Sequence, residues 1–511
     1  MSDHVSNPDL AQSAPKSPLW EMLTIAAPVV ATMTSYTLMQ FADKMMVSRI
    51  GPDPIYVGAQ GNGGLASWAP ISIMMGFVTV INTFVSQNLG ANKPERGAAY
   101  VWAGIWLNLV FYLAMIVPIA MALPWVFEAI RDTTLPADEF ARAAERDRLA
   151  AGYGRILLYA AFVTMACRAV SQYFYGLHRP MVVMIASILG NIVNLVLNSF
   201  LIYGPTAPAS MGLGWLDAWF HFCASTSASM GIPRLGIDGA AYATVIGTIV
   251  ELVIPLAVFL SPKYNRLYHT RAPWRVSMPH IRDLLRIGWA PALNFGNEMV
   301  CWTIFMVYLV GAFGPMHSTA GWIAHQWMTL SFMPTVGISV AITAMVGKSL
   351  GAGRPHEARQ RAWLGVRVAT TYMTLCGVVF FVFRDQLIGW FVDPLTPEAE
   401  RELILSLGAK FLIAAAAFQF FDGVAMTLSG ALKGAGDTKW PSVATMVLSW
   451  TIIVGGGLAL VKYAPELGSV GPWIAAATYI FAVCVFITWR FLAGHWEEIE
   501  LLKKSAGAEV R

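Results

Sequence analysis

The chain carries little charge for its length. Only 13% of its 511 residues are charged, 56% are hydrophobic, and the mean hydropathy is +0.57. A typical soluble domain has about 25% charged residues, so this composition excludes an ordinary soluble globular protein. The net charge of +4 is small. We therefore expect no nucleic-acid partner.

Several chemical motifs are missing as well. The five cysteines show neither CxxC nor paired spacing, which argues against a disulfide framework. No hydrophobic segment contains HExxH, GxSxG or a cysteine-rich metal spacing, and no nucleotide-binding loop is present. We therefore expect neither an enzyme nor an ATP-driven pump, and no nucleotide partner. Residues 1–17 are polar and proline-rich without a basic start, so we expect no cleavable signal peptide.

Long hydrophobic runs fill most of the chain. Each has about 20 residues or more, enough to cross a bilayer as a helix. An all-α integral membrane protein follows. We place about twelve spans at 18–42, 57–82, 98–126, 152–174, 181–204, 236–260, 283–312, 319–347, 361–383, 403–428, 439–461 and 471–492.

Basic residues concentrate in every second loop. The connection at 261–286 has six lysines and arginines against one acid, and 348–367 is similarly basic. The alternate loops at 131–148 and 384–402 mix both signs. By the positive-inside rule, we expect a multi-pass membrane protein with both termini cytoplasmic. In the outer loop 205–235, Trp215, Trp219 and Phe220 predict a short interfacial helix.

The two halves of the chain repeat each other at an interval of about 260 residues. GFVTVINTFVSQNLGANKPERGAAYVWAG (76–104) matches GISVAITAMVGKSLGAGRPHEARQRAWLG (337–365), with Gly90 at the position of Gly351. Six spans in each half would give the halves one orientation, so we expect two six-helix lobes related by pseudo-twofold symmetry along the membrane normal. The expected parts are an N-terminal cytoplasmic tail (1–17), an N lobe (18–260), a basic cytoplasmic linker (261–282), a C lobe (283–495) and a C-terminal cytoplasmic tail (496–511).

Two weaker echoes support the repeat. The AAP at 26–28 returns as WAP at 289–291. LGIDGAAYATVIG (235–247) returns more loosely as LGSVGPWIAAATYI (467–480).

Three carboxylates, Asp43, Glu298 and Asp422, stand alone in apolar stretches. A charge near the bilayer centre costs about 2.5–3.5 kcal/mol on insertion scales, so it rarely persists without a function. Only Asp43 has a basic neighbour close by in the helix, Lys44. The counter-ion of the other two is therefore expected from solution, as a proton or a small cation. This pattern indicates a transporter driven by an ion gradient.

Four motifs stand near the ends of spans in both halves. They are FADKMMVSRIG (41–51), VSQNLGANKPERG (85–97), AHQWMTLSFMPTVGISVAITAMVGKSLGAG (324–353) and LKGAGDTKWP (432–441). In this order they resemble the motifs of the multidrug and toxic compound extrusion (MATE) family, most closely its NorM-like bacterial branch. The resemblance covers nearly all of residues 18–495.

The resemblance implies a secondary active antiporter. Such a protein exports lipophilic, mostly cationic drugs or toxic organic compounds in exchange for Na⁺ or H⁺, and contributes to antibiotic resistance. It implies no cofactor besides the coupling ion, and its partners are small-molecule lipophilic cations and the lipid bilayer. We expect a monomer. The alternative is a lipid-linked precursor flippase of the same superfamily, which needs an arginine-lined cavity, whereas Arg168 is the main arginine within the N-terminal spans.

The resemblance assigns Glu298 and Asp422 to a cation site in the C lobe, where they are metal ligands if the coupling ion is Na⁺. Independently, a carboxylate pair suits a hard cation and can equally hold protons. Aromatic side chains near these acids suit lipophilic cations, although most aromatic residues in such a chain pack helices or face lipid. The candidate lining of a substrate cavity is Phe295, Trp302, Trp327 and Phe418.

The N lobe departs from the family pattern. Another branch of the family combines the first-span Asp with an N-x-x-x-D pair in the fifth span, but here Asn194 is kept and Asn198 replaces the acid. Thr244 matches a further polar position of that site. We expect Asp43, Asn194, Asn198 and Thr244 to form a proton or substrate site that binds no metal ion. Alternatively, Asp43 pairs with Lys44 or with an arginine at the outer surface.

Overall fold

The computed structural model describes residues 17–51, 55–131, 133–134, 136–208, 214–392 and 397–502. Helices account for most of these residues, and no strand occurs among them. α1 shows why the helices begin where they do. The Ser17 hydroxyl caps its first turn by accepting a hydrogen bond from the Trp20 amide at 3.3 Å, and Pro18 takes the first helical position, where no amide proton is needed.

The first half of the chain contributes eleven helices to the described structure. Three of them continue directly from the helix before: α3 from α2, α5 from α4 through a π-helical turn η3, and α7 from α6 after a bend. In order they are α1 (Pro18–Val47), α2 (Ile55–Thr79), α3 (Ile81–Gly90), α4 (Gly97–Phe111), η3 (Tyr112–Ile116), α5 (Val117–Ile130), α6 (Ala137–Tyr159), α7 (Ala161–Gly176), α8 (Met181–Leu201), α9 (Gly214–Met230), α10 (Ile237–Phe259) and α11 (Pro262–Tyr268).

The second half has longer helices and two π-helical segments. These segments, η4 and η6, continue α12 and α17. In order the elements are α12 (Met278–Thr303), η4 (Ile304–Val310), α13 (Pro315–Gly351), α14 (Pro355–Val382), α15 (Arg384–Gly389), α16 (Glu398–Ala435), α17 (Lys439–Leu448), η6 (Ser449–Gly456), α18 (Gly457–Tyr463) and α19 (Val470–Leu492).

The number of spans agrees with the prediction. Eleven helical runs are long and apolar enough to cross a membrane, and the pair α6–α7, bent by 47°, passes the same test and brings the number to 12. The predicted boundaries were less accurate. α12 begins at Met278, inside the segment assigned to the linker, because Pro279 is tolerated in the first turn of a helix.

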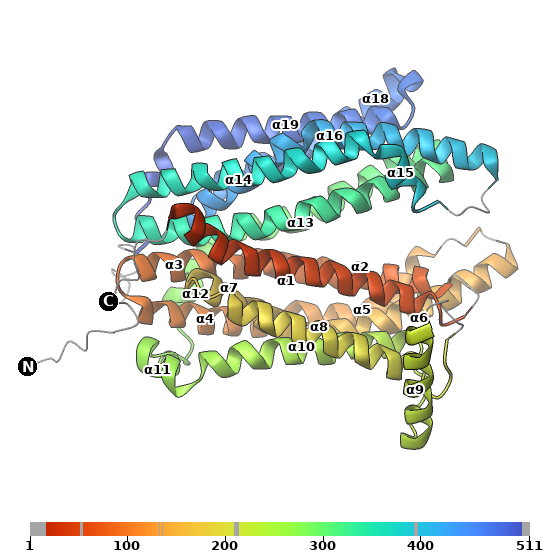
Figure 1. Cartoon of the computed structure of the whole chain (residues 1–511), viewed down its shortest axis with the longest axis horizontal. Coiled ribbons are helices and arrows are strands. Elements are labelled where there is room, and N and C mark those ends of the chain that lie inside the picture. The colour runs from red at the N-terminus through yellow and green to blue at the C-terminus, as the bar shows by residue number, and fades with distance from the viewer. Residues whose placement is uncertain are drawn as a thin grey trace, which may run out of the picture.

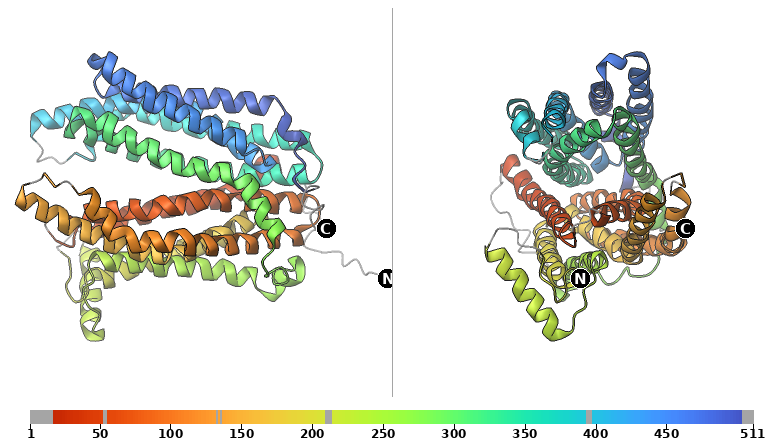
Figure 2. Two further views of the ribbon diagram at one scale, coloured as in Figure 1. Left: turned by 180° about the vertical axis from the view of Figure 1, so that it is seen from behind. Right: turned by 90° about the vertical axis from the view of Figure 1, so that its right-hand side faces the viewer.

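The helices form two groups. In Figure 1, α1 to α10 lie together along one side and α13 to α19 along the other, and Figure 2 shows the same division from behind and along the helices. The packing within the groups is repeated. α1 packs on α8 as α12 packs on α17, and α2 packs on α6 as α13 packs on α16. The two six-helix lobes predicted from the internal repeat are therefore present.

Two glycines confirm the weakest echo in the sequence. Gly236 precedes α10 with φ 58° and ψ −131°, and Gly468 lies just before α19 with φ 53° and ψ −144°. Positive φ with such ψ values is accessible essentially only to glycine. The sixth and twelfth spans therefore start from the same unusual turn.

The lobes meet through contacts that are themselves repeated. The backbone of Gly90 lies against the Lys348 carbonyl, and that of Gly351 lies against the Gln87 carbonyl, so that a Cβ at either glycine would overlap the opposite helix. The same sequence offset separates Gly90 from Gly351 and Gln87 from Lys348. Such reciprocal contacts are the signature of a twofold axis, which here passes between the ends of α3 and α13.

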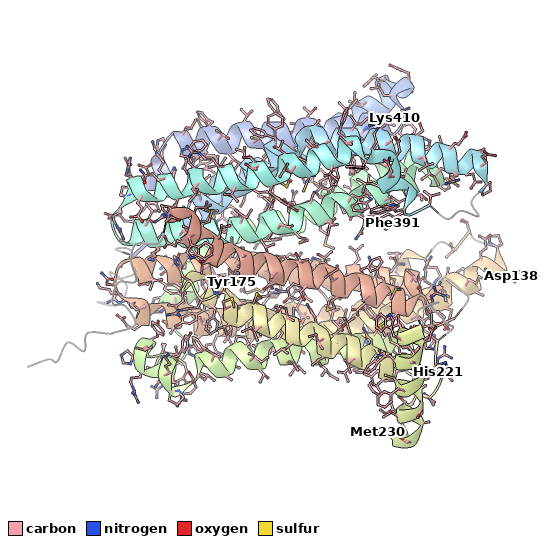
Figure 3. All side chains as sticks on the ribbon, in the orientation of Figure 1. Asp138, Tyr175, His221, Met230, Phe391 and Lys410 are labelled. Carbon is pink, nitrogen blue, oxygen red and sulfur yellow. The ribbon has the colours of Figure 1, made fainter. Side chains whose placement is uncertain are left out.

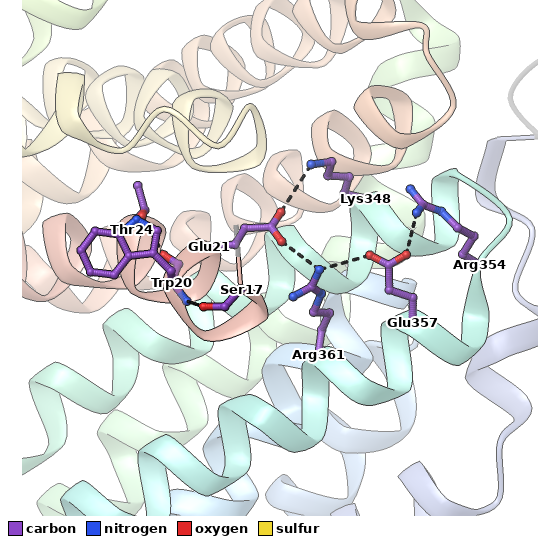
Figure 4. A network of polar contacts seen from close by, with 8 residues as sticks. All are labelled: Ser17, Trp20, Glu21, Thr24, Lys348, Arg354, Glu357 and Arg361. Atoms are coloured by element: carbon purple, nitrogen blue, oxygen red, sulfur yellow. Dashed lines mark hydrogen bonds and ion pairs between the residues drawn. The ribbon is translucent and has the colours of Figure 1, made fainter. Parts of the chain in front are cut away.

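A second reciprocal pair lies close by. The Glu21 carboxylate on α1 is 2.9 Å from Arg361 on α14, and it also lies 3.5 Å from Lys348 (Figure 4). The Tyr100 hydroxyl on α4 donates a hydrogen bond of 3.1 Å to Asp283 on α12, which is the corresponding contact of the other lobe. The start of each lobe's first span is thus tied to the third span of the opposite lobe.

These lobe contacts lie at the end of the molecule that carries the basic loops. In Figure 1, α1 begins, α19 ends and α11 lies at that end. Asp138, His221 and Phe391 lie toward the opposite end (Figure 3). The predicted helix in the 205–235 loop is α9, which runs across the direction of the spans (Figure 1). Trp215 is 73% exposed on it. Phe220, in contrast, is buried against Tyr203. Residues 209–213 of that loop lie outside the described residues.

Candidate functional site

Glu298 and Asp422 are brought together from α12 and α16. Their carboxylates lie within electrostatic range of each other, and Tyr479 of α19 lies within range of both. Both acids are half-buried rather than buried; Asp422 lies within α16, and Glu298 lies near the end of α12, before η4 continues the span. The arrangement is therefore a pair of like charges that a mobile cation can reach.

Neutral oxygen atoms complete this cluster. The Asn294 side chain, one turn before Glu298, donates a hydrogen bond to that carboxylate. Its own oxygen Oδ1 is buried, with no hydrogen-bond partner in the described part of the chain. Two carboxylates and a free amide oxygen are hard oxygen ligands, which suit Na⁺ and can equally hold protons. Glu298, Asp422 and Asn294 would hold the ion.

A metal that prefers nitrogen or sulfur ligands fits the chain less well. Across the described residues, no group of three or more His, Cys, Asp or Glu side chains could hold a metal ion. The two acids at the site lie among neutral oxygen groups instead.

The next turn of α12 is tied to the π-helical segment η6. The Asn297 amide donates to the Ser449 hydroxyl at 2.9 Å, and the Trp450 indole donates to the Asn297 oxygen at 2.7 Å. π-helical turns often mark functional sites because they release the backbone from the regular ladder. Here η4 continues α12, which carries Glu298, and η6 continues α17, which packs on α12.

One basic residue near the pair was missed by the sequence analysis. Lys433, at the end of α16, lies within electrostatic range of Glu298. Among the described residues no ion pair within 4 Å joins them, since the ion pairs found lie elsewhere. The search of the sequence covered only basic residues one helical turn from each acid, whereas Lys433 comes within electrostatic range of Glu298 only in the folded molecule.

The four N-lobe candidates form one hydrogen-bonded chain. Asn198 donates to the Asp43 carboxylate and lies 3.3 Å from the Asn194 oxygen. Asn194 in turn donates to the Thr244 hydroxyl at 3.2 Å. Asp43 is only 6% exposed, whereas its neighbour Lys44 is exposed. None of the ion pairs found among the described residues includes Asp43. The structure therefore contradicts the alternative in which Asp43 forms an ion pair with Lys44 or an arginine at the outer surface.

Two further residues of this cluster were missed. Tyr153 on α6 lies within electrostatic range of Asp43 and is hydrogen-bonded to Gln60 on α2. The oxygens Asn198 Oδ1 and Gln60 Oε1 are both buried without a hydrogen-bond partner in the described structure. Gln60 and Tyr153 could have been noticed as polar residues in apolar spans. Their positions along α2 and α6 did not show that either residue lies near Asp43, which is on α1.

The candidate cavity residues are not all placed alike. Phe418 is 3% exposed and belongs to the core of the C lobe, where it packs with side chains of α13 and α19. Trp302 is half-buried, stacked edge-on to Phe305 and His325. Trp327 is also half-buried, with its indole donating to the Leu387 carbonyl at 3.0 Å. Phe295 is half-buried on α12, one turn before Glu298.

A fourth intramembrane carboxylate, Glu251 on α10, was overlooked. It is the single acid in the interior of the sixth span and is 5% exposed. The rule that an isolated acid in an apolar stretch marks a function applies to it as well. Arg168, the arginine weighed against the flippase alternative, lies over the ring of Tyr36 at 4.6 Å. One such arginine is not an arginine-lined cavity.

Comparisons with known proteins agree on one family. The MatE family profile matches residues 28–200 and 298–456. A probable multidrug resistance protein NorM of Pseudomonas syringae pv. tomato is 29% identical over 495 residues, which cover 96% of this chain and 98% of that protein.

Two solved structures show the same fold. A MATE protein crystallised in a straight conformation superimposes with a TM-score of 0.78 at 20% identity, covering 94% of this chain and 97% of that one. An outward-facing multidrug resistance MATE transporter gives a TM-score of 0.77 at 20% identity, covering 94% of this chain and 96% of that one.

Proposed function

The chain belongs to the MatE family of multidrug efflux transporters, and from this we propose that it exports lipophilic, mostly cationic compounds by antiport with Na⁺ or H⁺. The observation that carries the proposal is the coupled pair Glu298 and Asp422, which no arginine or lysine neutralises at ion-pair distance among the described residues. Because two like charges close together repel each other, the pair binds a cation or a proton favourably.

The exchange follows from the charges at this site. When Na⁺ or protons occupy the carboxylates, the site no longer attracts a cationic substrate. When the ion leaves, the negative potential returns and a lipophilic cation is drawn toward the neighbouring aromatic residues Phe295 and Trp302. Two ligands that compete for one negative site and bind in turn give antiport.

The lobe contacts support a proposal for the conformational state. They tie α1 to α13 and α14, and α12 to α2 and α4, at the end with the basic loops. We take that end as cytoplasmic, which closes the molecule toward the cytoplasm and leaves substrate release at the outer end. Transport then requires the contacts between Gly90, Gly351 and their partner helices to open.

Transport in proteoliposomes tests the proposed function. The purified protein should take up a fluorescent lipophilic cation against its gradient when a Na⁺ gradient or a pH gradient is imposed separately. Stimulation by one of the two gradients identifies the coupling ion. Uptake that neither gradient stimulates would contradict antiport.

Labelling tests the proposed orientation in the cell inner membrane. In a cysteine-free background, Arg266→Cys on α11 should resist a membrane-impermeant thiol reagent in intact cells, whereas Ser225→Cys on α9 should react. Both positions are exposed in the structure. The opposite result would place the basic loops outside.

A further inference from the structure

Glu251 lies at the centre of a polar cluster that the proposed function does not use. The Tyr36 hydroxyl of α1 and the Ser187 hydroxyl of α8, at 2.8 Å, both donate hydrogen bonds to its carboxylate oxygen Oε1. One turn along α8, Asn191 donates to the Ser35 hydroxyl of α1 at 2.6 Å. Three spans of the N lobe therefore converge on one buried carboxylate.

A close helix crossing builds this cluster. Gly190 of α8 and Gly247 of α10 each lie so near the other's carbonyl that an added Cβ would stand 2.7 Å from it, and at Gly190 it would also stand 3.2 Å from the Glu251 Cβ. The two glycines let the helix backbones approach, which is a common role of small residues between spans. The approach brings Ser187, one turn from Gly190, within hydrogen-bonding reach of Glu251.

Charge compensation at Glu251 is lacking. The carboxylate takes part in none of the ion pairs found among the described residues. Arg168 of α7 lies over the ring of Tyr36, 4.6 Å from its centroid, and forms no ion pair with Glu251 among those of the described residues. α8, which packs most closely on α10, has no ionisable group. The ionisable groups on the other helices packed against α10 are Glu21, Tyr36, Asp43 and Lys44 on α1, Cys167, Arg168, Tyr173 and Tyr175 on α7, Asp138, Glu139, Arg142, Glu145, Arg146, Asp147, Arg148, Tyr153, Arg155 and Tyr159 on α6, and Lys263, Tyr264, Arg266 and Tyr268 on α11.

The cluster is separate from the chain at Asp43. Tyr36 precedes Asp43 by seven residues on α1, and Glu251 follows Thr244 by seven residues on α10. Seven residues are two helical turns, or about 10 Å. Glu251 therefore lies deeper in the N lobe, farther from the outer end than Asp43.

The internal repeat relates this cluster to the C-lobe site. The offset between the AAP and WAP motifs, applied to Tyr36, leads to within one residue of Glu298. Tyr36 in the first span therefore corresponds to Glu298 in the seventh. Glu251 lies in the sixth span within one helical turn of the position equivalent to Tyr479 in the twelfth. In both lobes an acid on one of these spans faces a tyrosine on the other. In the N lobe the tyrosine lies on the first span and the acid on the sixth, whereas in the C lobe the acid lies on the seventh span and the tyrosine on the twelfth.

We propose that Glu251, with Tyr36 and Ser187 as hydroxyl partners, is a second proton-binding site of the transporter, which gains and loses one proton in each transport cycle. The carboxylic acid releases its proton to water, and the carboxylate left behind accepts hydrogen bonds from both hydroxyls. An uncompensated charge at this depth is costly, so these bonds hold α1 and α8 against α10 most firmly in the ionised state. Because α1 also packs on α13 of the other lobe, protonation of Glu251 changes how firmly α1 is held at the lobe interface.

Infrared difference spectroscopy on the purified full-length protein tests proton binding without reference to transport. Between acidic and alkaline buffer, the wild type should lose a protonated carboxyl band that Glu251→Gln lacks. Tyr36→Phe, which keeps the ring under Arg168 but removes one hydrogen bond, should keep the band at a shifted frequency. Glu139→Gln, at an exposed position of α6, is the matched control and should leave the band unchanged.

Two spectroscopic outcomes would overturn the site. One is a Glu251→Gln spectrum that matches the Glu139→Gln spectrum across the pH range. The other is loss of the acid band on addition of Na⁺ at constant pH, because Glu251 would then be a sodium ligand.

A transport experiment tests the role of Glu251 in the cycle; it rests on the proposed antiport and is interpreted independently of the infrared spectra. In proteoliposomes that carry a pH-sensitive dye, Glu251→Gln should move about one proton fewer for each substrate than Glu139→Gln does. If the wild type shows no ion-coupled exchange while the infrared band is present, the proposed antiport fails and the proton site stands. If the wild type exchanges and Glu251→Gln moves as many protons as the control, the role of Glu251 in the cycle is wrong.

Discussion

At the scale of single residues, Asn198 decides what Asp43 is able to do. An amide in place of an acid leaves one carboxylate, which accepts a hydrogen bond from Asn198 and has no second charge beside it. One carboxylate with a few amides holds a hydrated cation weakly. The cluster suits a proton or a contact to a cationic substrate better than a metal ion.

Replacing Asp43 by Asn should therefore lower drug resistance but leave cation binding in the C lobe intact. Calorimetric titration of the purified variant with Na⁺, or with acid if the coupling ion is H⁺, measures that binding. An affinity that falls as far in Asp43→Asn as in Asp422→Asn would place a true cation site in the N lobe.

Glu298 and Asp422 should act as one site, because each is within range of the other's charge. Glu298→Gln and Asp422→Asn each remove one charged ligand. That loss costs about 1.5–3 kcal/mol, which is roughly a ten- to hundredfold loss of cation affinity. Ion-driven efflux should stop while the amount of inserted protein stays normal. Normal ion-driven transport by either variant would refute the assignment.

At the scale of helices, the ends of the spans control how the lobes meet. Glu21 at the start of α1 is the link, since its carboxylate contacts Arg361 and Lys348 of the other lobe (Figure 4). Arg361 is itself placed by Glu357 at 3.4 Å within α14. The ion pairs are partly exposed, so their contribution is that of a screened pair.

Breaking this link should favour separation of the lobes at the basic end. Glu21→Gln is expected to shift the balance by about 1 kcal/mol, or roughly fivefold in the ratio of the two states. Spin labels on α1 and α14 would report the shift as a longer distance. Arg148→Gln is the control, because Arg148 pairs with Glu145 within α6, outside this network, and should leave the distance unchanged. Equal distances in Glu21→Gln and Arg148→Gln would contradict the link.

At the scale of the whole molecule, we expect His178 to make the lobe contact sensitive to pH. It lies in the turn between α7 and α8, and its ring is hydrogen-bonded to the Ala344 backbone of the other lobe. Burial, together with the nearby Lys348, lowers the pKa of His178 to about 3. When the lobes separate, its pKa should return to about 6.5, the usual value for histidine.

Acidification should therefore loosen the lobe contact. The separated state has the higher pKa, so it binds the proton first. The closed arrangement loses stability as the pH falls below about 6.5, by up to about 1.4 kcal/mol for each pH unit. The distance between spin labels on α8 and α13 should lengthen between about pH 8 and about pH 5 in the wild type. In His178→Gln this change should be reduced, and a wild-type profile in that variant would show that another group is responsible.

The sequence by itself determined the class of fold, the number of spans, the repeat and the location of three of the four isolated acids. These depend on hydrophobic run length and on offsets along the chain, which are local properties. It also pointed to Asp43, Asn194, Asn198 and Thr244 through a family pattern, and the structure joins them by hydrogen bonds.

Only the tertiary structure decided which distant groups meet. Lys433 comes within electrostatic range of Glu298, and Tyr36 donates a hydrogen bond to Glu251, because the fold brings together helices that are far apart in the chain. The glycine contacts of Gly90 and Gly351 show the same dependence, since their partners belong to the opposite lobe. A pattern along one helix reports which face is polar. It carries no information on which helix will cover that face, because helix packing depends on the shape and charge of both partners.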